Sequence, residues 1–117
     1  MPPESLKLLE DMRQAARGIE AIVSGNSIEN YRCNLQMRWA VERGFEIVGE
    51  ALSQLRKIDP TTAESITDWR AIISFRNVLI HGYAVVNFDK TWDIAVTELP
   101  TLLRELDQLL GKSPDVA

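Results

Sequence analysis

The stretch WRAIISFRNVLIHGY, residues 69–83, decides how the rest of the chain is interpreted. Its apolar residues recur at helical spacing and are Trp69, Ile72, Ile73, Leu79 and Ile80. Arg76 lies inside this stripe, within about 20° of the Trp69 direction at ~100° per residue. The only histidine, His81, follows five positions later and Tyr83 comes two residues after it. An arginine, a histidine and a tyrosine near one helix end are side chains suited to phosphate chemistry.

The composition predicts a single folded domain over 1–117, with an ordered core at about 4–111. Of the 117 residues, 45% are hydrophobic and 26% charged, and no low-complexity run occurs. The longest apolar runs are far shorter than the ~20 residues of a membrane span, and no signal-peptide pattern opens the chain. We therefore expect a cytoplasmic protein with no membrane partner. The net charge of −4 means that nucleic acid would need a local basic site.

The single cysteine, Cys33, excludes an internal disulfide and is consistent with a reducing compartment. It is not expected to be a nucleophile, because the only histidine lies in a different predicted element. No His and Cys spacing typical of a metal site is present, so neither a metal nor another cofactor is expected.

Three further segments have helical patterns. The first covers about 4–24, and the second begins after the N-cap Ser27 and continues for roughly thirty residues to about 58. The third is capped by Asn87 or Asp89 and ends near 111, with Pro100 predicted to kink it near Val96.

These patterns predict an all-α, mostly up-and-down four-helix bundle with no sheet. Residues 83–88 are read as an extended connector, and Asp59 with Pro60 ends the second helix. Thr67 or Asp68 is expected to cap the central helix. The second helix carries a stripe of small residues and two interior glycines, which predicts close packing against neighbouring helices.

Each motif side chain also has a purely structural interpretation. Arg76 could extend its stem along the core toward solvent, or pair with one of three glutamates spaced four apart on the second helix: Glu42, Glu46 and Glu50. His81 could cap the end of its helix, and Tyr83 could be a core residue with a wet hydroxyl. The tryptophans lie on apolar stripes and are expected in the core; they are Trp39, Trp69 and Trp92.

The combination is more informative than its parts. Arg76, four residues, His81, one residue and Tyr83, with Asn77 directly after the arginine, resembles the Arg-x4-His-x-Tyr motif of HEPN domains. The specific resemblance is to HepT-like toxins encoded beside a minimal nucleotidyltransferase antitoxin. It spans most of the chain, in three segments that occur in the same order as in that family: WAVERGFEIVGEAL (39–52), DWRAIISFRNVLIHGY (68–83) and TWDIAVTELPTLLREL (91–106).

This resemblance implies a HEPN-like bundle that acts as a metal-independent endoribonuclease toxin, with its site in a homodimer cleft. It also implies that a partner nucleotidyltransferase silences the toxin by attaching AMP to Tyr83. On this hypothesis His81 is the general acid or base, Arg76 stabilises the transition state, and Asn77 orients the phosphate or the imidazole. Tyr83 is both a cleft residue and the AMP acceptor. Further assembly of the dimer with the antitoxin stays open.

The residues support a dimeric site independently at one point. RNA cleavage without metal needs a base, an acid and a cation, yet this chain has one histidine. A two-fold axis near His81 would supply two. Arg76 and His81 lie about 140° apart on an ideal helix, so they converge only if the helix unwinds or a second chain contributes. The alternatives are a non-catalytic module that binds a nucleotide or docks a nucleotidyltransferase, and a plain structural bundle.

Overall fold

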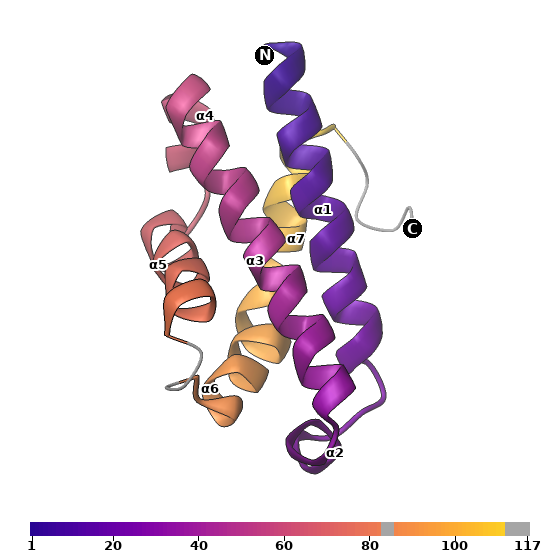
Figure 1. Ribbon diagram of the computed structural model, residues 1–117. Helices are drawn as coiled ribbons and strands as arrows, with labels where there is room; N and C mark the ends of the chain where they lie inside the picture. The colour runs from indigo at the N-terminus through magenta and orange to yellow at the C-terminus, as the bar shows by residue number, and fades with distance from the viewer. Residues whose placement is uncertain (83–85, 112–117) are drawn as a thin grey trace.

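The computed structural model describes residues 1–82 and 86–111. The elements in chain order are α1 (Pro3–Val23), α2 (Ile28–Cys33), α3 (Leu35–Ile58), α4 (Pro60–Glu64), α5 (Trp69–His81), α6 (Phe88–Asp93), the π-helical turn η2 (Ile94–Glu98) and α7 (Leu99–Leu109). Four long segments alternate in direction: α1, α3, α5 and the continuous α6–η2–α7 (Figure 1). The described ranges contain helices and no strand, which confirms the predicted all-α bundle.

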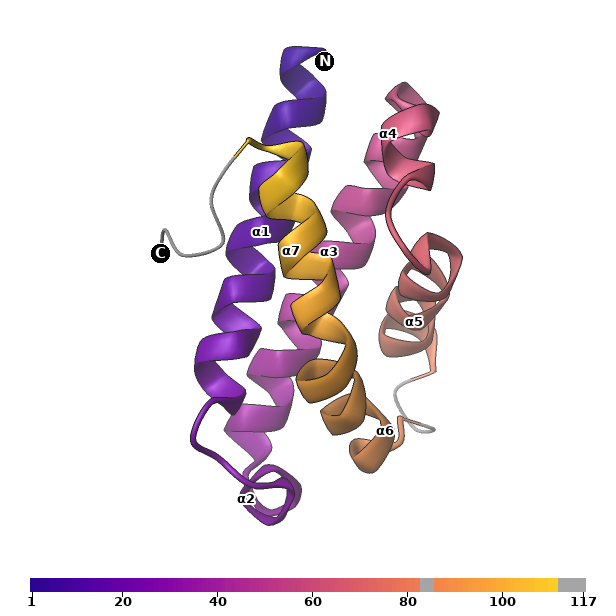
Figure 2. The same ribbon diagram turned by 180° about the vertical axis from the view of Figure 1, so that it is seen from behind.

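The core lies between α1, α3 and α7, as their buried apolar stripes show. Its largest buried members include Leu9, Met12, Ile19, Val41, Val48, Leu52, Leu55 and Leu106. Helix α5 contributes only one buried residue, Leu79, and packs mainly against α3. It therefore lies on the flank of the bundle (Figure 2), and most of its residues are accessible to solvent at least in part.

The predicted second helix is divided in two at Asn34, which corrects the expectation of one continuous helix. Ser27 caps α2 as predicted, with its hydroxyl accepting from the Asn30 amide at 3.1 Å. Asn34 leaves helical geometry at φ −118° and ψ 100°, and its side chain accepts from the Met37 amide at 2.9 Å. Asparagine side chains compete for backbone groups in this way, so the break needs neither glycine nor proline.

The segment around Pro60 also contains more structure than expected. Asp59 ends α3 as predicted, but its carboxylate also caps the short helix α4 by accepting from the Thr62 amide at 3.3 Å. Pro60 occupies the first turn of α4, where its missing N–H has no partner to lose. The Ser5 hydroxyl donates to Asp59 at 2.9 Å, which ties the start of α1 to this corner.

The last helical segment begins and bends close to the predicted positions. Asn87 is the cap, accepting from the Lys90 amide at 3.1 Å, and the expected kink takes the form of the π-helical turn Ile94–Glu98. There the Leu99 amide donates to the Ile94 carbonyl, five residues back. Because Pro100 has no N–H to offer Val96, widening the turn before the proline lets the helix continue.

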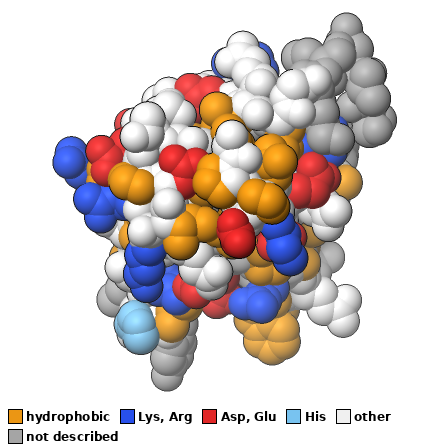
Figure 3. Space-filling model, turned by 90° about the horizontal axis from the view of Figure 1, so that it is seen from above, with side chains coloured by type: hydrophobic (Ala, Val, Ile, Leu, Met, Phe, Trp, Pro, Cys, Tyr) orange, Lys and Arg blue, Asp and Glu red, His pale blue; other side chains and the backbone are white. Residues whose placement is uncertain are grey.

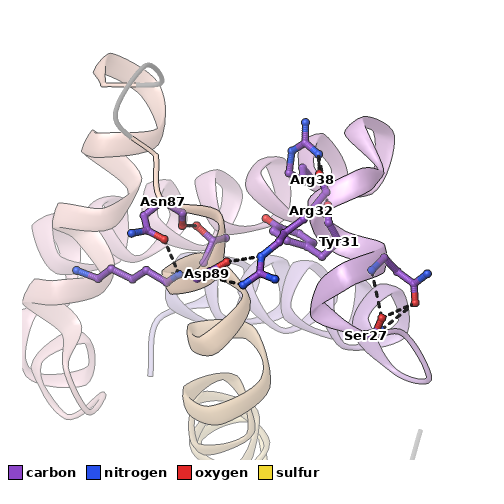
Figure 4. A network of polar contacts seen from close by, with 9 residues as sticks. Ser27, Tyr31, Arg32, Arg38, Asn87 and Asp89 are labelled. Atoms are coloured by element: carbon purple, nitrogen blue, oxygen red, sulfur yellow. Dashed lines mark hydrogen bonds and ion pairs between the residues drawn. The ribbon is translucent and has the colours of Figure 1, made fainter.

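A corner between α2 and α6 holds the start of the last helix (Figure 4). Arg32 donates twice to the carboxylate of Asp89, at 2.8 Å each. Arg38 donates to the carbonyl of Arg32 at 2.6 Å, and its guanidinium lies 4.3 Å from the centre of the Phe88 ring. These contacts anchor the chain soon after the motif segment.

The prediction that all three tryptophans are core residues is wrong for Trp39, whose surface is 62% exposed. Trp39 lies two residues from the buried Val41, a rotation of about 200°, so it points away from the core. Trp69 and Trp92 are partly buried and pack against the core. Over the described ranges, no helix combines the length and apolar character needed to cross a membrane.

Candidate active site

Helix α5, which carries the motif, begins at an unusual turn. Asp68, one of the two positions predicted for the cap, is the N-cap residue. It has a left-handed φ of 59°, and its side chain makes no capping hydrogen bond. Thr67, the other predicted position, is not the N-cap residue. Its amide and hydroxyl instead donate to the carboxylate of Glu105 on α7, at 2.9 and 2.5 Å. The start of α5 is therefore fixed to α7 rather than by a local cap.

Gly49 is a position on α3 at which α5 approaches closely, through Arg76. A Cβ atom at Gly49 would lie 2.3 Å from the Cβ and 2.8 Å from the Cγ of Arg76. Because glycine has no Cβ, the Arg76 stem can lie directly on the α3 backbone. Gly44 lets Ile19 of α1 pack equally closely against α3, since a Cβ at Gly44 would lie 2.5 Å from Cγ1 of Ile19. The close packing predicted from these glycines is confirmed, and both contacts are within the chain.

The Arg76 guanidinium contacts one neighbour on each of two helices. Its Nη2 donates to Glu50 on α3 in a short ion pair, and its Nη1 donates to Oδ1 of Asn77 at 2.9 Å. The Nε atom is buried and has no hydrogen-bond partner among the described residues. An arginine has five N–H donors, so beyond the bonds to Glu50 and Asn77 two N–H groups remain on the terminal nitrogens, while Nε–H is buried.

Glu50 is itself held by a second contact. Gln54, one turn further along α3, donates to Oε1 of Glu50 at 3.0 Å. This hydrogen bond, followed by the positive charges of Arg76 and Lys57, lowers the pKa of Glu50 below its ordinary value. Sequence reasoning did not single out Gln54, although its position four residues after Glu50 places the two side chains on one face.

The three glutamates of the ridge have different environments, and the structure selects Glu50 as the partner of Arg76. Glu46 pairs with Arg43 at 3.8 Å on its own helix. Glu42 is half-buried, and burial raises the pKa of its carboxyl group. A sequence spaced regularly in fours cannot distinguish these sites, because the choice depends on where Gly49 admits α5.

His81 is exposed and is the last residue of α5. The Gly82 amide donates to the Val78 carbonyl at 2.7 Å, so the helix remains regular from Arg76 to His81. Of the two predicted routes by which Arg76 and His81 could converge, unwinding of the helix before Gly82 is not seen in the structure, and a contribution from a second chain stays a prediction. Tyr83, the fourth motif residue, lies outside the described residues.

The surroundings of the site are open and mixed in charge. A hollow of about 440 Å³ between α1 and α3 is lined in part by Arg43, Glu50 and Gln54. An apolar groove of about 500 Å³ lies on another side of α5, against η2 and α7, and its lining includes none of Arg76, Asn77 and His81. Basic and acidic side chains are interspersed on the face seen from above (Figure 3), so this face offers no broad basic field for a polyanion.

Comparison with known proteins gives a consistent result. The chain matches the family described as Ribonuclease HepT-like over residues 12–109. A protein of Caldanaerobacter subterraneus subsp. tengcongensis named "Putative RNase TTE0752" is 31% identical over 104 residues, which cover 89% of this chain and 92% of that protein. A protein of Thermococcus cleftensis named "Probable ribonuclease HepT" is 29% identical over 101 residues, covering 86% of this chain and 91% of that protein. No solved structure matches the chain significantly.

Proposed function

Because this chain belongs to the HepT-like ribonuclease family, we propose that it is a metal-independent endoribonuclease in which Arg76 and His81 act on the reacting phosphate. The observation that carries the proposal is the state of Arg76. Its guanidinium is held at the contact between α3 and α5, yet its side chain is still 25% exposed, and the bonds to Glu50 and Asn77 use only one N–H of each terminal nitrogen. His81 is exposed at the end of the same helix.

The reaction needs three contributions. A base removes the proton of a ribose 2′-hydroxyl, whose oxygen then bonds to the adjacent phosphorus. An acid protonates the 5′-oxygen as its bond to phosphorus breaks, leaving a cyclic phosphate and a free 5′-hydroxyl. A cation stabilises the extra charge on the phosphorus oxygens. His81 is suited to proton transfer, Arg76 to charge stabilisation, and Asn77 to orienting the phosphate or the imidazole.

A homodimer would complete the site. One chain supplies one histidine, and the regular helix keeps Arg76 and His81 about 140° apart. If two copies meet with His81 near the two-fold axis, each site receives a second imidazole, so that one acts as base and the other as acid. The same arrangement would concentrate two copies of Arg76 in one cleft, which offsets the net charge of −4 for an RNA substrate.

We further propose that the protein is the toxin of a toxin–antitoxin pair in the cytoplasm, folded as one domain over 1–117. Its partner would be a minimal nucleotidyltransferase that uses ATP to place AMP on the Tyr83 hydroxyl, with release of pyrophosphate. A bulky anion there would occupy the position of an RNA phosphate and block it by size and charge. Incubation with the partner and ATP should add one AMP mass to a peptide containing Tyr83, and addition elsewhere would overturn this assignment.

The test of the nuclease itself uses purified protein that mass spectrometry shows to be free of AMP. It is incubated with labelled RNA in EDTA, beside His81→Ala and, as a matched control on the same helix, Ser74→Ala. We expect cleavage by the wild type and by Ser74→Ala, and a loss of about 10²- to 10⁴-fold in His81→Ala. No cleavage of several RNA classes by unmodified wild type would favour the non-catalytic binding module.

A further inference from the structure

We propose that Glu50 is a positioning residue that sets the orientation of the Arg76 guanidinium for the phosphate. The proposal rests on the function proposed above and deepens it, because it names a residue of α3 that orients the Arg76 guanidinium on α5. Glu50 acts through Arg76 and is not itself required to touch RNA.

The contacts form a continuous chain from α3 to the motif. Gln54 donates to one oxygen of Glu50 at 3.0 Å, and Arg76 donates to the other oxygen. On its other side, Arg76 donates to Asn77 at 2.9 Å. The Glu50 carboxylate is therefore held by Gln54 at one oxygen and by Arg76 at the other, and the guanidinium is fixed at both of its terminal nitrogens. A fixed fork loses less side-chain freedom when it binds a phosphate than a mobile one does.

Packing alone does not explain this ion pair. The Arg76 stem is already held against α3 by the absence of a side chain at Gly49. The carboxylate-bearing side chain of Glu50 is 46% exposed, and exposed ion pairs contribute little to folding. An acidic group beside a phosphate site also repels the substrate, so its presence there is unfavourable unless it improves the arrangement of the cation. Fixing the guanidinium supplies that improvement.

The proposal predicts a separation of kcat from KM. Glu50→Gln removes the charge but leaves an isosteric amide, so the guanidinium becomes less constrained while the repulsion of RNA also falls. We expect kcat to decrease about 10-fold or more and KM to stay equal or fall. Glu46→Gln is the matched control. It removes the same charge from a residue that lies one turn before Glu50 and pairs with Arg43 instead of Arg76. Its kcat should stay within about twofold of wild type.

A second measurement observes the guanidinium directly, whether or not RNA is cut. The Arg76 Nε–H signal is assigned in a ¹⁵N–¹H spectrum by its absence in Arg76→Lys, and its exchange with water is compared between variants. In Glu50→Gln we expect a shifted signal and faster exchange, and in Gln54→Ala a smaller change in the same direction. In Glu46→Gln the signal should match wild type. Thermal midpoints of all variants are recorded to confirm folding.

The outcomes separate this proposal from the proposed function. If wild type cleaves RNA and Glu50→Gln cleaves with an unchanged kcat, the positioning role is overturned and the nuclease stands. If wild type does not cleave, the nuclease fails, and the Nε–H signal still decides whether Glu50 orders Arg76. An Arg76 signal identical in wild type and Glu50→Gln overturns the proposal in either case. If Glu46→Gln lowers kcat as much as Glu50→Gln, loss of charge alone accounts for the effect.

Discussion

Several ion pairs join helices among the described residues, and two of them, Arg13–Asp107 and Arg76–Glu50, have contrasting surroundings. Arg13 on α1 donates to Asp107 on α7 at 2.7 Å, with the two side chains 11% and 2% exposed. Arg76 on α5 pairs with Glu50 on α3 at the flank, where the side chains are 25% and 46% exposed. Arg17 adds a second contact to Asp107 at 3.5 Å. One pair is enclosed by the core helices and the other borders solvent.

The difference indicates what each pair contributes. Two charges taken out of water must keep each other as partners, since a buried charge without one is strongly unfavourable. A half-exposed pair is solvated and screened, so it adds at most about 1 kcal/mol to the free energy of unfolding. We therefore interpret Arg13–Asp107 as a structural contact and Arg76–Glu50 as a functional one. The predictions below test this assignment, starting with the largest expected effect.

Asp107→Ala should lower the free energy of unfolding by about 3 kcal/mol or more, because it removes an enclosed carboxylate that contacts both Arg13 and Arg17. Urea unfolding followed by circular dichroism measures this loss. RNA cleavage per folded molecule should stay near the wild-type value. Asp107→Asn, which keeps the shape, serves as a second variant if the alanine protein does not fold. A loss under 1 kcal/mol in both variants would show that the enclosed pair is not structural.

Arg76→Ala should produce the opposite pattern. We expect RNA cleavage to fall about 10²- to 10³-fold, the size seen when one stabilising donor is removed from a transition state. The free energy of unfolding should change by under about 1 kcal/mol. Arg70→Ala is the matched control, since Arg70 is an exposed arginine of the same helix whose guanidinium stacks on Trp69. Equal activity losses in the two variants would contradict a specific role for Arg76.

Much of the fold could be predicted from the sequence because its signals are local. The apolar spacing of α1 and the caps at Ser27 and Asn87 depend on a few neighbouring residues, and the structure contains all three. The break at Asn34 was missed because asparagine is compatible with a helix until its side chain caps the next turn. Trp39 was misplaced because apolar character alone does not say which side of a helix faces the core.

The site was less predictable for the same physical reason. Residues of one helix, such as Arg76 and His81, have positions that follow from helical geometry, and the separation of about 140° needed no structure. The partner of Arg76 depends on the register between α3 and α5, which is fixed by contact of the Arg76 stem with Gly49. Among three evenly spaced glutamates, only that register selects Glu50.

Gly49→Ala should test that register directly. The added Cβ would lie 2.3 Å from the Cβ of Arg76 and 3.3 Å from the Ile72 carbonyl, so α5 must move away. We expect a loss of about 1–3 kcal/mol in unfolding free energy, together with reduced RNA cleavage. Gly18→Ala is the control, because nothing lies within 4 Å of a Cβ there and alanine should stabilise α1 by about 0.5–1 kcal/mol. If Gly49→Ala left the free energy of unfolding and RNA cleavage unchanged, α5 could shift against α3 at little cost, and the proposed register would not depend on Gly49.

The smallest expected effect is the pH dependence of the exposed pair. The Gln54 hydrogen bond and the charges of Arg76 and Lys57 lower the pKa of Glu50 below its ordinary 4.5. A lowered pKa means that the folded state favours the ionised form, so this contribution is complete above pH 4.5 and is lost as the pH falls through the folded value. The difference in unfolding free energy between wild type and Glu50→Gln should therefore stay constant from about pH 5 to 8 and shrink in acid. Because Glu50 is nearly half exposed, the difference should remain under about 1 kcal/mol throughout. A difference of several kcal/mol at pH 7 would make this pair as structural as Arg13–Asp107, and the contrast between the two would disappear.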